Sequence, residues 1–410
     1  MCNLEKEVNM ALNEGSLPFR KLDFVTDASG YIAMLIYNSH PPGELLIAPK
    51  YYPDPRGTWI SHDSGQKYNR FEYYWNLKQK NDGESSRVYE VDKNPLHDYA
   101  TDVVDRFNQH LAMDPCHGVP MYRLPRGEVA RYWDARKKYM DVQARVPASM
   151  QKFTPFLKKM ADAFEPSQVG ITGSYLYDLH QDFSDINFVL YDNAVTTFRD
   201  FLSAEKALVP CQDIEITYPG SSWPGWLGNK NDVSRLLPPV VKQDAGKAIV
   251  QIKHRFIGSM HDPAHEGTRA GFWMSNSVDP HPHGTFKKVQ VGIAVVTGHV
   301  ASWVDDLPSG HLRLDNVELL GIHPVLDPAR CGTIDARGSS IARGLSEKVH
   351  VSAVQVIGEF NRMLLADEDI IAYGLVEKIT IAGQAKPVHE LLVGGREVGG
   401  WIFPVQDTIA

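Results

Sequence analysis

The stretch that decides the fold is Val169–Asp192, which reads VGITGSYLYDLHQDFSDINFVLYD. A short β-rich lead runs into Gly173-Ser174, a polar loop follows, and Asp185 and Asn187 then open an apolar run. Because Asp185 and Asn187 are two residues apart, both side chains point to one face of the strand that the apolar run predicts. Two oxygen-bearing side chains that face a Gly-Ser turn form half of a site for a hard cation such as Mg²⁺.

Gly173-Ser174 followed by Ser184-Asp185-Ile186-Asn187 resembles the signature of the nucleotidyltransferase superfamily, the DNA polymerase β-like enzymes. The motif GSxxxxLHxxxSDIN is most similar to that of uncharacterised archaeal-type nucleotidyltransferase-domain proteins. The resemblance implies that Gly173 and Ser174 hold the phosphates of a nucleoside triphosphate. It also implies that Asp185 and a third carboxylate on a later strand bind Mg²⁺, which neutralises charge on the attacking and leaving oxygens during in-line attack on phosphorus.

Asn187 departs from the family pattern, which has a second Asp at this position. An amide oxygen ligates a cation without bringing charge, and a single Asp holds Mg²⁺ weakly before substrate binds. Three hypotheses follow: the metal arrives with the nucleotide, the fold serves other chemistry, or catalysis is lost. The purely structural alternative is a helix-turn-strand unit whose Asp caps a turn.

Further candidate residues for a nucleotide site follow later in the chain. Asp213 and Glu215 alternate in QDIEITY, which predicts a strand with both acids on one face and makes them candidate metal ligands. Asp262 is a further candidate for the third carboxylate. Lys253 and Arg255 are candidate nucleotide-binding residues, Arg255 through bidentate pairing with phosphate. The alternative for these two cations is an edge strand blunted by charge.

Histidines supply a second set of candidates. His180, in the signature loop, is a candidate catalytic residue that orients a phosphate or acts as a general base; the alternative is a hydrogen bond to the turn. His261 and His265 have the i,i+4 spacing of helical metal sites, although a proline stands between them. His281 and His283 are flanked by prolines and predict a loop. A transition-metal site is left open.

The composition, 43% hydrophobic and 22% charged, is that of a soluble globular protein. A net charge of −8 disfavours a general nucleic-acid binder, which would need a basic surface. The four cysteines lie far apart without a CxxC motif, which predicts reduced thiols in a cytoplasmic protein. No apolar run reaches about eighteen residues and no signal-peptide core is present, so we expect no membrane segment.

The 410 residues predict an α/β and α+β multidomain protein in three parts. Residues 1–147 form an α+β domain with a hairpin from Lys21, a strand at Glu44–Ala48 and a turn over 51–57. Residues 148–286 form the nucleotidyltransferase-like domain. Residues 287–410 are β-rich and predict an OB-like or other small barrel, or a sandwich.

Two helices are predicted beside the signature stretch. Residues 127–146 are dense in charge, with acid–base pairs Asp134–Lys138 and Asp141–Arg145 at i,i+4. Residues 152–164 are amphipathic, with apolar residues at helical spacing on one side. The aromatic residues at positions 68–75 lie beside basic residues and are interpreted as core, with a base-stacking platform as the alternative.

These patterns together predict an enzyme: Mg²⁺-dependent transfer of a nucleotidyl group from a nucleoside triphosphate to a small-molecule or protein acceptor. One alternative is a nucleotidyltransferase fold used for acid–base chemistry on a small metabolite, with His180 taking part. Another is a non-catalytic module that binds nucleotides or nucleic acid. A homodimer is left open. Fold analogy alone does not decide among these functions.

Overall fold

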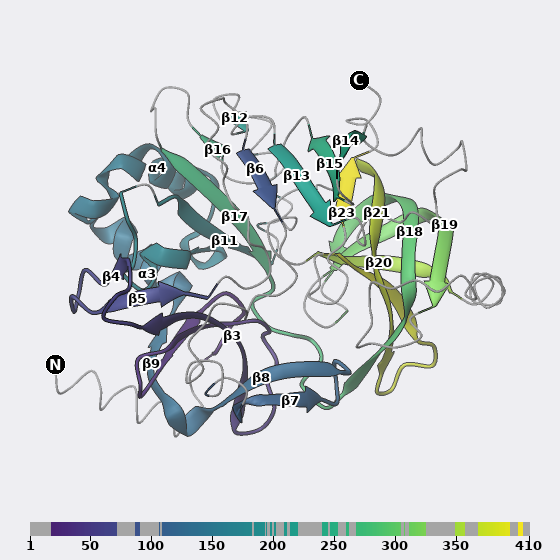
Figure 1. Ribbon diagram of the computed structural model, residues 1–410, viewed down its shortest axis with the longest axis horizontal. Coiled ribbons are helices and arrows are strands. Elements are labelled where there is room, and N and C mark those ends of the chain that lie inside the picture. Colours follow the sequence, from purple (N-terminus) through teal and green to yellow (C-terminus); the bar gives the residue numbers. More distant parts are fainter. Residues whose placement is uncertain are drawn as a thin grey trace.

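The computed structural model describes residues 18–71, 87–90, 109–182, 184–192, 209–210, 214–219, 240–244, 247–252, 260–261, 268–304, 311–324, 349–356, 368–393 and 401–404, with single positions at 106, 194, 197, 198, 201 and 307. Strands predominate in these ranges and form four sheets. In Figure 1 an N-terminal sheet and a central sheet lie on one side and a C-terminal barrel lies on the other.

The N-terminal sheet confirms the predicted hairpin. β1 (Phe24–Asp27) and β2 (Ile32–Leu35) are antiparallel around Gly30, whose φ of 83° suits glycine. β3 (Glu44–Pro53) starts where predicted but continues through residues assigned to the turn, because Tyr51 and Tyr52 are buried and pair with β5. The other strands are β4 (Trp59–Ile60), β5 (Lys67–Arg70), β7 (Leu111–Asp114), β8 (Val119–Pro125) and β9 (Val129–Trp133).

The helix predicted over 127–146 is wrong in its first half. The 3-10 turn η1 (Arg126–Glu128) leads into β9, which pairs with β1, and α3 (Ala135–Ala144) begins only afterwards. The helix starts there because the side chain of Asp134 caps it, accepting a hydrogen bond from the Lys137 backbone N–H at 3.0 Å. The predicted pairing of Lys138 with Asp134 is also wrong, since Lys138 lies 3.1 Å from Asp178.

The central sheet is mixed and contains the signature stretch. β10 (Val169–Thr172) and β11 (Ile186–Tyr191) are antiparallel, and β17 (Arg269–Ser275) runs parallel to β11. β16 (Met260–His261) and β12 (Val209–Pro210) complete it. The short helices η2 (Ala148–Phe153) and η3 (Pro166–Gln168) flank α4 (Thr154–Ala163).

The amphipathic prediction for α4 is confirmed. Its Phe156, Leu157 and Met160 are buried in one cluster with Phe188 of β11 and Phe272 of β17. Burying side chains of this size stabilises the fold by about 1.5–3 kcal/mol each. The helix therefore fixes one face of the sheet that carries Asp185 and Asn187.

A third sheet joins segments that are far apart in the sequence. It is made of β14 (Val240–Asp244), β15 (Lys247–Ile252), β13 (Ile214–Pro219) and β6 (Arg87–Glu90), in that order. β6 runs parallel to β13. A strand from the predicted domain 1–147 thus pairs with one from the predicted domain 148–286.

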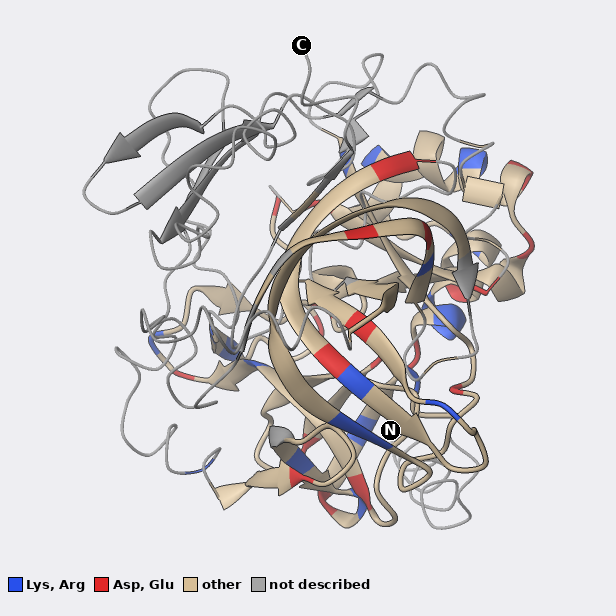
Figure 2. Ribbon diagram, turned by 90° about the vertical axis from the view of Figure 1, so that its right-hand side faces the viewer, with Lys and Arg blue, Asp and Glu red and all other residues tan. Residues whose placement is uncertain are grey.

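The C-terminal strands close into a five-stranded barrel. They are β18 (Phe286–Val304), β19 (His311–Pro324), β20 (Val351–Val356), β21 (Glu368–Ile381) and β22 (Val388–Val393). The order is β18-β19-β20-β22-β21, β21 pairs back with β18, and β20 and β22 are parallel. β23 (Trp401–Pro404) adds to β21. Figure 2 looks onto this barrel, with charged residues coloured along its strands.

Each strand of the barrel contributes one buried polar side chain to a single ionic cluster. The amine of Lys288 donates to Glu390 and, at 3.0 Å, to Gln355, and lies 3.5 Å from Glu377. His311 pairs with the other oxygen of Glu390. Burial alone would lower the pKa of Lys288, but Glu390 and Glu377 raise it above its ordinary value. Lys288 therefore keeps its charge although it is excluded from water, whereas burial lowers the pKa of His311 and favours its neutral form.

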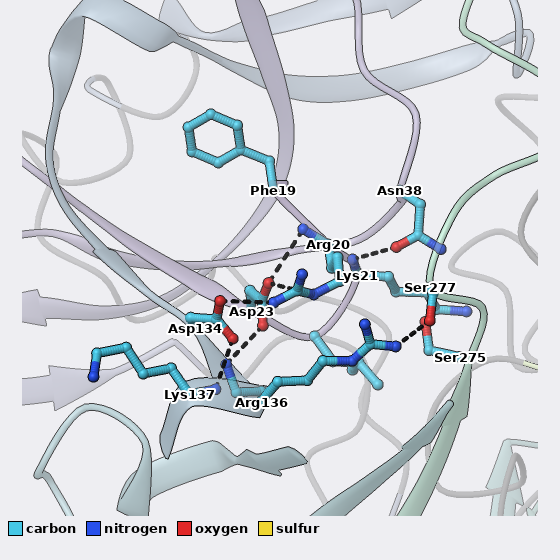
Figure 3. Close-up of polar contacts among 12 residues, drawn as sticks. Phe19, Arg20, Lys21, Asp23, Asn38, Asp134, Arg136, Lys137, Ser275 and Ser277 are labelled. Carbon is cyan, nitrogen blue, oxygen red and sulfur yellow. Dashed lines mark hydrogen bonds and ion pairs between the residues drawn. The ribbon is translucent and has the colours of Figure 1, made fainter. Parts of the chain in front are cut away.

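A buried carboxylate, that of Asp23, joins the N-terminal sheet to the central domain (Figure 3). It accepts hydrogen bonds from the Tyr132 hydroxyl, from the Arg20 backbone N–H at 3.2 Å and from the Ala135 backbone N–H at 2.8 Å. The guanidinium of Arg20 lies 3.6 Å from Asp23 and 2.7 Å from Asp134. Asp23 thus connects β1, β9 and the first residue of α3.

Asp23→Ala is expected to destabilise the protein by about 3–5 kcal/mol. It removes one of the two carboxylates that pair with Arg20, and it leaves the Tyr132 hydroxyl and two backbone N–H groups without their acceptor. Urea unfolding followed by circular dichroism measures the loss. Asp141→Ala, which removes an exposed carboxylate from α3, is the matched control and should change stability by no more than about 0.5 kcal/mol. Equal effects of the two substitutions would contradict this role for Asp23.

Candidate functional site

The Gly-Ser turn and the Asp-x-Asn strand come together as the sequence predicts. Thr172, the last residue of β10, lies opposite Asn187 of β11, and the 3-10 turn η4 (Gly173–Tyr175) follows directly. Gly173 has a φ of 71°, and a Cβ there would lie 3.2 Å from the Asn187 side-chain nitrogen. Glycine is therefore favoured both by the backbone conformation and by the close approach of the turn to Asn187. Ser174, Asp185 and Asn187 are all half-buried.

The orientation of the Asn187 amide is fixed by a residue that the sequence analysis did not consider, Trp273 of β17. The indole N–H of Trp273 donates to the Asn187 side-chain oxygen at 3.1 Å. An indole nitrogen can only donate, so the Asn187 NH₂ faces the other way and donates to Asp185 at 3.3 Å. Asn187 thus bridges an indole and a carboxylate, which favours a positioning role over the predicted role of metal ligand.

His180 lies inside a stack of aromatic rings. Its ring is 4.1 Å from that of His62 and 4.2 Å from that of Tyr175, both nearly parallel to it, and its carbonyl is bonded to the His62 ring at 2.7 Å. Burial, reinforced by the nearby His62, lowers the pKa of His180 to about 4. A neutral imidazole with so low a pKa is a weak general base at pH 7, so the geometry favours packing over proton transfer.

Two lysines that the sequence analysis did not assign to the site lie at the signature loop. The amine of Lys152, from η2, donates to the backbone carbonyl of Asp182. Burial lowers the pKa of Lys152, although Asp182 and Asp185 act in the opposite direction. Lys138 of α3 lies 3.1 Å from Asp178. Only the fold reveals these neighbours, because no local pattern links either lysine to the loop.

Within the described residues, none of the other predicted site residues is seen at this loop. Asp213, Asp262, Lys253 and Arg255 lie outside the described ranges. Glu215 lies in β13, in the third sheet rather than in the sheet of β11. Of the predicted histidine pair, His261 lies in β16 and His265 is outside the described ranges.

The described part of the site fits a magnesium ion only through Asp185. Mg²⁺ prefers carboxylates, phosphates and water, and the amide of Asn187 is oriented with its nitrogen toward Asp185. One carboxylate is a weak resident site. It is sufficient for an ion that is bound mainly by the phosphates of a nucleotide.

Comparison with known proteins gives no relative: no family model matches the chain, and neither the characterised proteins nor the solved structures contain a significant match. Among the described residues, no helix has the length and apolar character needed to cross a membrane.

The depressed pKa of His180 predicts a loss of stability in acid. An unfolded imidazole takes up a proton below about pH 6.5, whereas the folded one resists protonation until about pH 4, so stability falls as the pH decreases across this window. His180→Phe keeps a stacking ring and removes the titrating group. The variant should lose less stability than the wild type between pH 6.5 and 4, by on the order of 1 kcal/mol. Parallel stability curves in urea would contradict the assignment.

Proposed function

We propose that the protein binds a nucleoside triphosphate at the Gly173-Ser174 turn and catalyses Mg²⁺-dependent transfer of its nucleotidyl group to a small-molecule or protein acceptor. The observation that carries this proposal is the close approach of the turn at Gly173 to Asn187 of β11, whose side chain contacts Asp185. A turn that requires glycine lets backbone N–H groups come close to phosphate. The carboxylate of Asp185, the residue that precedes β11, would then meet a cation that the phosphates carry.

Each residue of the proposed site has a separate task. Gly173 and Ser174 hold the phosphates, and Lys152 supplies positive charge beside the loop. Asp185 holds Mg²⁺, which on binding would neutralise charge on the reacting phosphate. Asn187, held by Trp273, orients the Asp185 carboxylate.

The proposal extends to the fold. The central sheet with its β10–turn–β11 unit would be polymerase β-like. The barrel would be OB-like, because an OB-fold is a five-stranded barrel and this one joins its strands in the order first-second-third-fifth-fourth. OB-folds bind oligonucleotides in other proteins, but the net charge of −8 favours a small-molecule or protein acceptor over a nucleic acid. A cytoplasmic location belongs to the same proposal.

The rival function, acid–base chemistry on a small metabolite, depends on His180. Its ring is enclosed between His62 and Tyr175, and its low pKa reduces its strength as a base. The geometry therefore supports the nucleotide-binding proposal better than this rival.

Calorimetric titration of ATP, GTP, CTP and UTP onto the full chain, with and without Mg²⁺, tests the proposal. We expect one triphosphate to bind only with Mg²⁺, and Asp185→Asn to weaken that binding by about tenfold or more, the usual cost of disturbing a metal site. Asp141→Asn, which removes a carboxylate charge from the exposed face of α3, should leave the affinity unchanged.

Two outcomes would overturn the proposal. One is that none of the four triphosphates binds. The other is that the affinity is the same in the wild type and in Asp185→Asn, which would place any nucleotide away from the Gly-Ser turn.

A further inference from the structure

A second cluster of ligating side chains lies where the N-terminal sheet meets the barrel. Asp114 ends β7, His117 lies in the turn between β7 and β8, and His283 lies in the segment that leads from β17 into β18. One ligand atom from each of the three residues lies within 4.8 Å of the other two. The three positions converge although 166 residues separate His117 from His283 in the sequence.

The distances within this cluster suit a shared ion. One oxygen of Asp114 is 2.9 Å from the Nδ1 atom of His117, and the other is 2.9 Å from the Nε2 atom of His283. Two ligand atoms that are each about 2.1 Å from one tetrahedrally coordinated ion lie about 3.4 Å apart, a separation of the same order as those in this cluster. Each imidazole thus directs one nitrogen at an oxygen of Asp114, and an ion bound there would replace these two direct contacts.

Hydrogen bonds and ring stacking hold these ligands in place. The Asp114 carboxylate accepts from the backbone N–H groups of Cys116 and His117 at 2.9 Å, and from Arg123 at 2.9 Å. The ring of His117 stacks on Tyr37 at 4.1 Å and is only 3% exposed. The Nδ1 atom of this ring faces Asp114 at 2.9 Å, so the ring presents this nitrogen to the cluster.

We propose that Asp114, His117 and His283 form a binding site for a divalent transition-metal ion such as Zn²⁺. Two imidazoles and one carboxylate are the donor set of Zn²⁺, Co²⁺ and Fe²⁺ sites, whereas Mg²⁺ prefers all-oxygen ligands. Three protein ligands leave a coordination position for water or another ligand. The positive charge of Arg123 on Asp114 reduces the attraction for an ion, so the imidazoles carry much of the affinity.

The ion would add to backbone contacts that already connect the β7–β8 turn to the start of β18. The Gly284 N–H donates to the sulfur of Cys116 at 3.1 Å, and the Lys288 N–H donates to the carbonyl of Cys116 at 2.5 Å. A metal bound by Asp114, His117 and His283 would link the β7–β8 turn to the segment that leads into the barrel. Its binding should therefore raise the thermal stability of the full chain. This site is independent of the proposed nucleotide site.

The test is titration of Co²⁺, Zn²⁺ and Mg²⁺ onto the full chain after chelator treatment, with the visible Co²⁺ spectrum and the melting temperature as readouts. We expect one Co²⁺ or Zn²⁺ per chain, no comparable binding of Mg²⁺, and a higher melting temperature with Zn²⁺. His283→Ala should weaken the affinity by at least about tenfold. His281→Ala, two residues away on the same loop, is the matched control and should bind as the wild type does.

His283→Gln serves as a second variant with a side chain of similar size if His283→Ala does not fold. If the three side chains only hydrogen-bond to one another and bind no metal, the wild type will show no saturable metal binding. That result would overturn the proposal, as would equal affinities of the wild type and the folded His283 variants.

Discussion

The Asp23 carboxylate is the constraint on which the position of the candidate site depends. It accepts from the first backbone N–H of α3 at Ala135 and from Tyr132 of β9, and pairs with Arg20. The neighbouring carbonyl of Leu22 accepts a hydrogen bond from the hydroxyl of Thr172 at 2.6 Å. Thr172 immediately precedes Gly173. The segment that Asp23 anchors therefore also fixes the strand end from which the Gly-Ser turn begins.

Burial of the Asp23 carboxylate opposes its ionisation. Burial raises the pKa of Asp23 to about 7, although Arg20 and the hydrogen bonds of Tyr132 and Ala135 favour the ionised form. The backbone around it is also unusual, since Leu22 has a φ of 72° without being glycine. A strained residue next to a buried charge persists only where the surrounding contacts determine it. Here those contacts are the ones that position the site.

The substitution of amide for acid at position 187 has a physical consequence for the neighbouring carboxylate. Two adjacent carboxylates would repel each other unless a cation lay between them. With Asn187 in place, an N–H donor faces Asp185, and Trp273 fixes that orientation. Asp185 is thus stabilised without a resident ion. This arrangement agrees with a metal that arrives with the nucleotide.

Local patterns in the sequence predicted the elements that are defined by contacts between residues close together in the chain. The β1–β2 hairpin around Gly30 and the apolar face of α4 follow from periods of two and of three to four residues. β9 was missed because it lies in the charge-dense stretch 127–146 although only Arg131 within it is charged, and pairing with β1 holds Val129–Trp133 extended. Tertiary pairing overrides local propensity in such cases.

The candidate site was predictable only in the part that is contiguous in the sequence. Gly173, Ser174, Asp185 and Asn187 lie within one stretch, and their convergence follows from a single antiparallel pair of strands. Trp273 and Lys152 come from other elements, and the contact of His283 with Asp114 joins segments far apart in the sequence. A single sequence contains no local signal for such neighbours.

A crystal structure of the full chain with a non-hydrolysable nucleoside triphosphate, and with Mn²⁺ in place of Mg²⁺, tests the central claim most directly. The account predicts phosphate oxygens at the backbone N–H groups of Gly173 and Ser174. It also predicts an anomalous Mn²⁺ peak beside the Asp185 carboxylate. A triphosphate bound elsewhere, or an ion that does not contact Asp185, would contradict it.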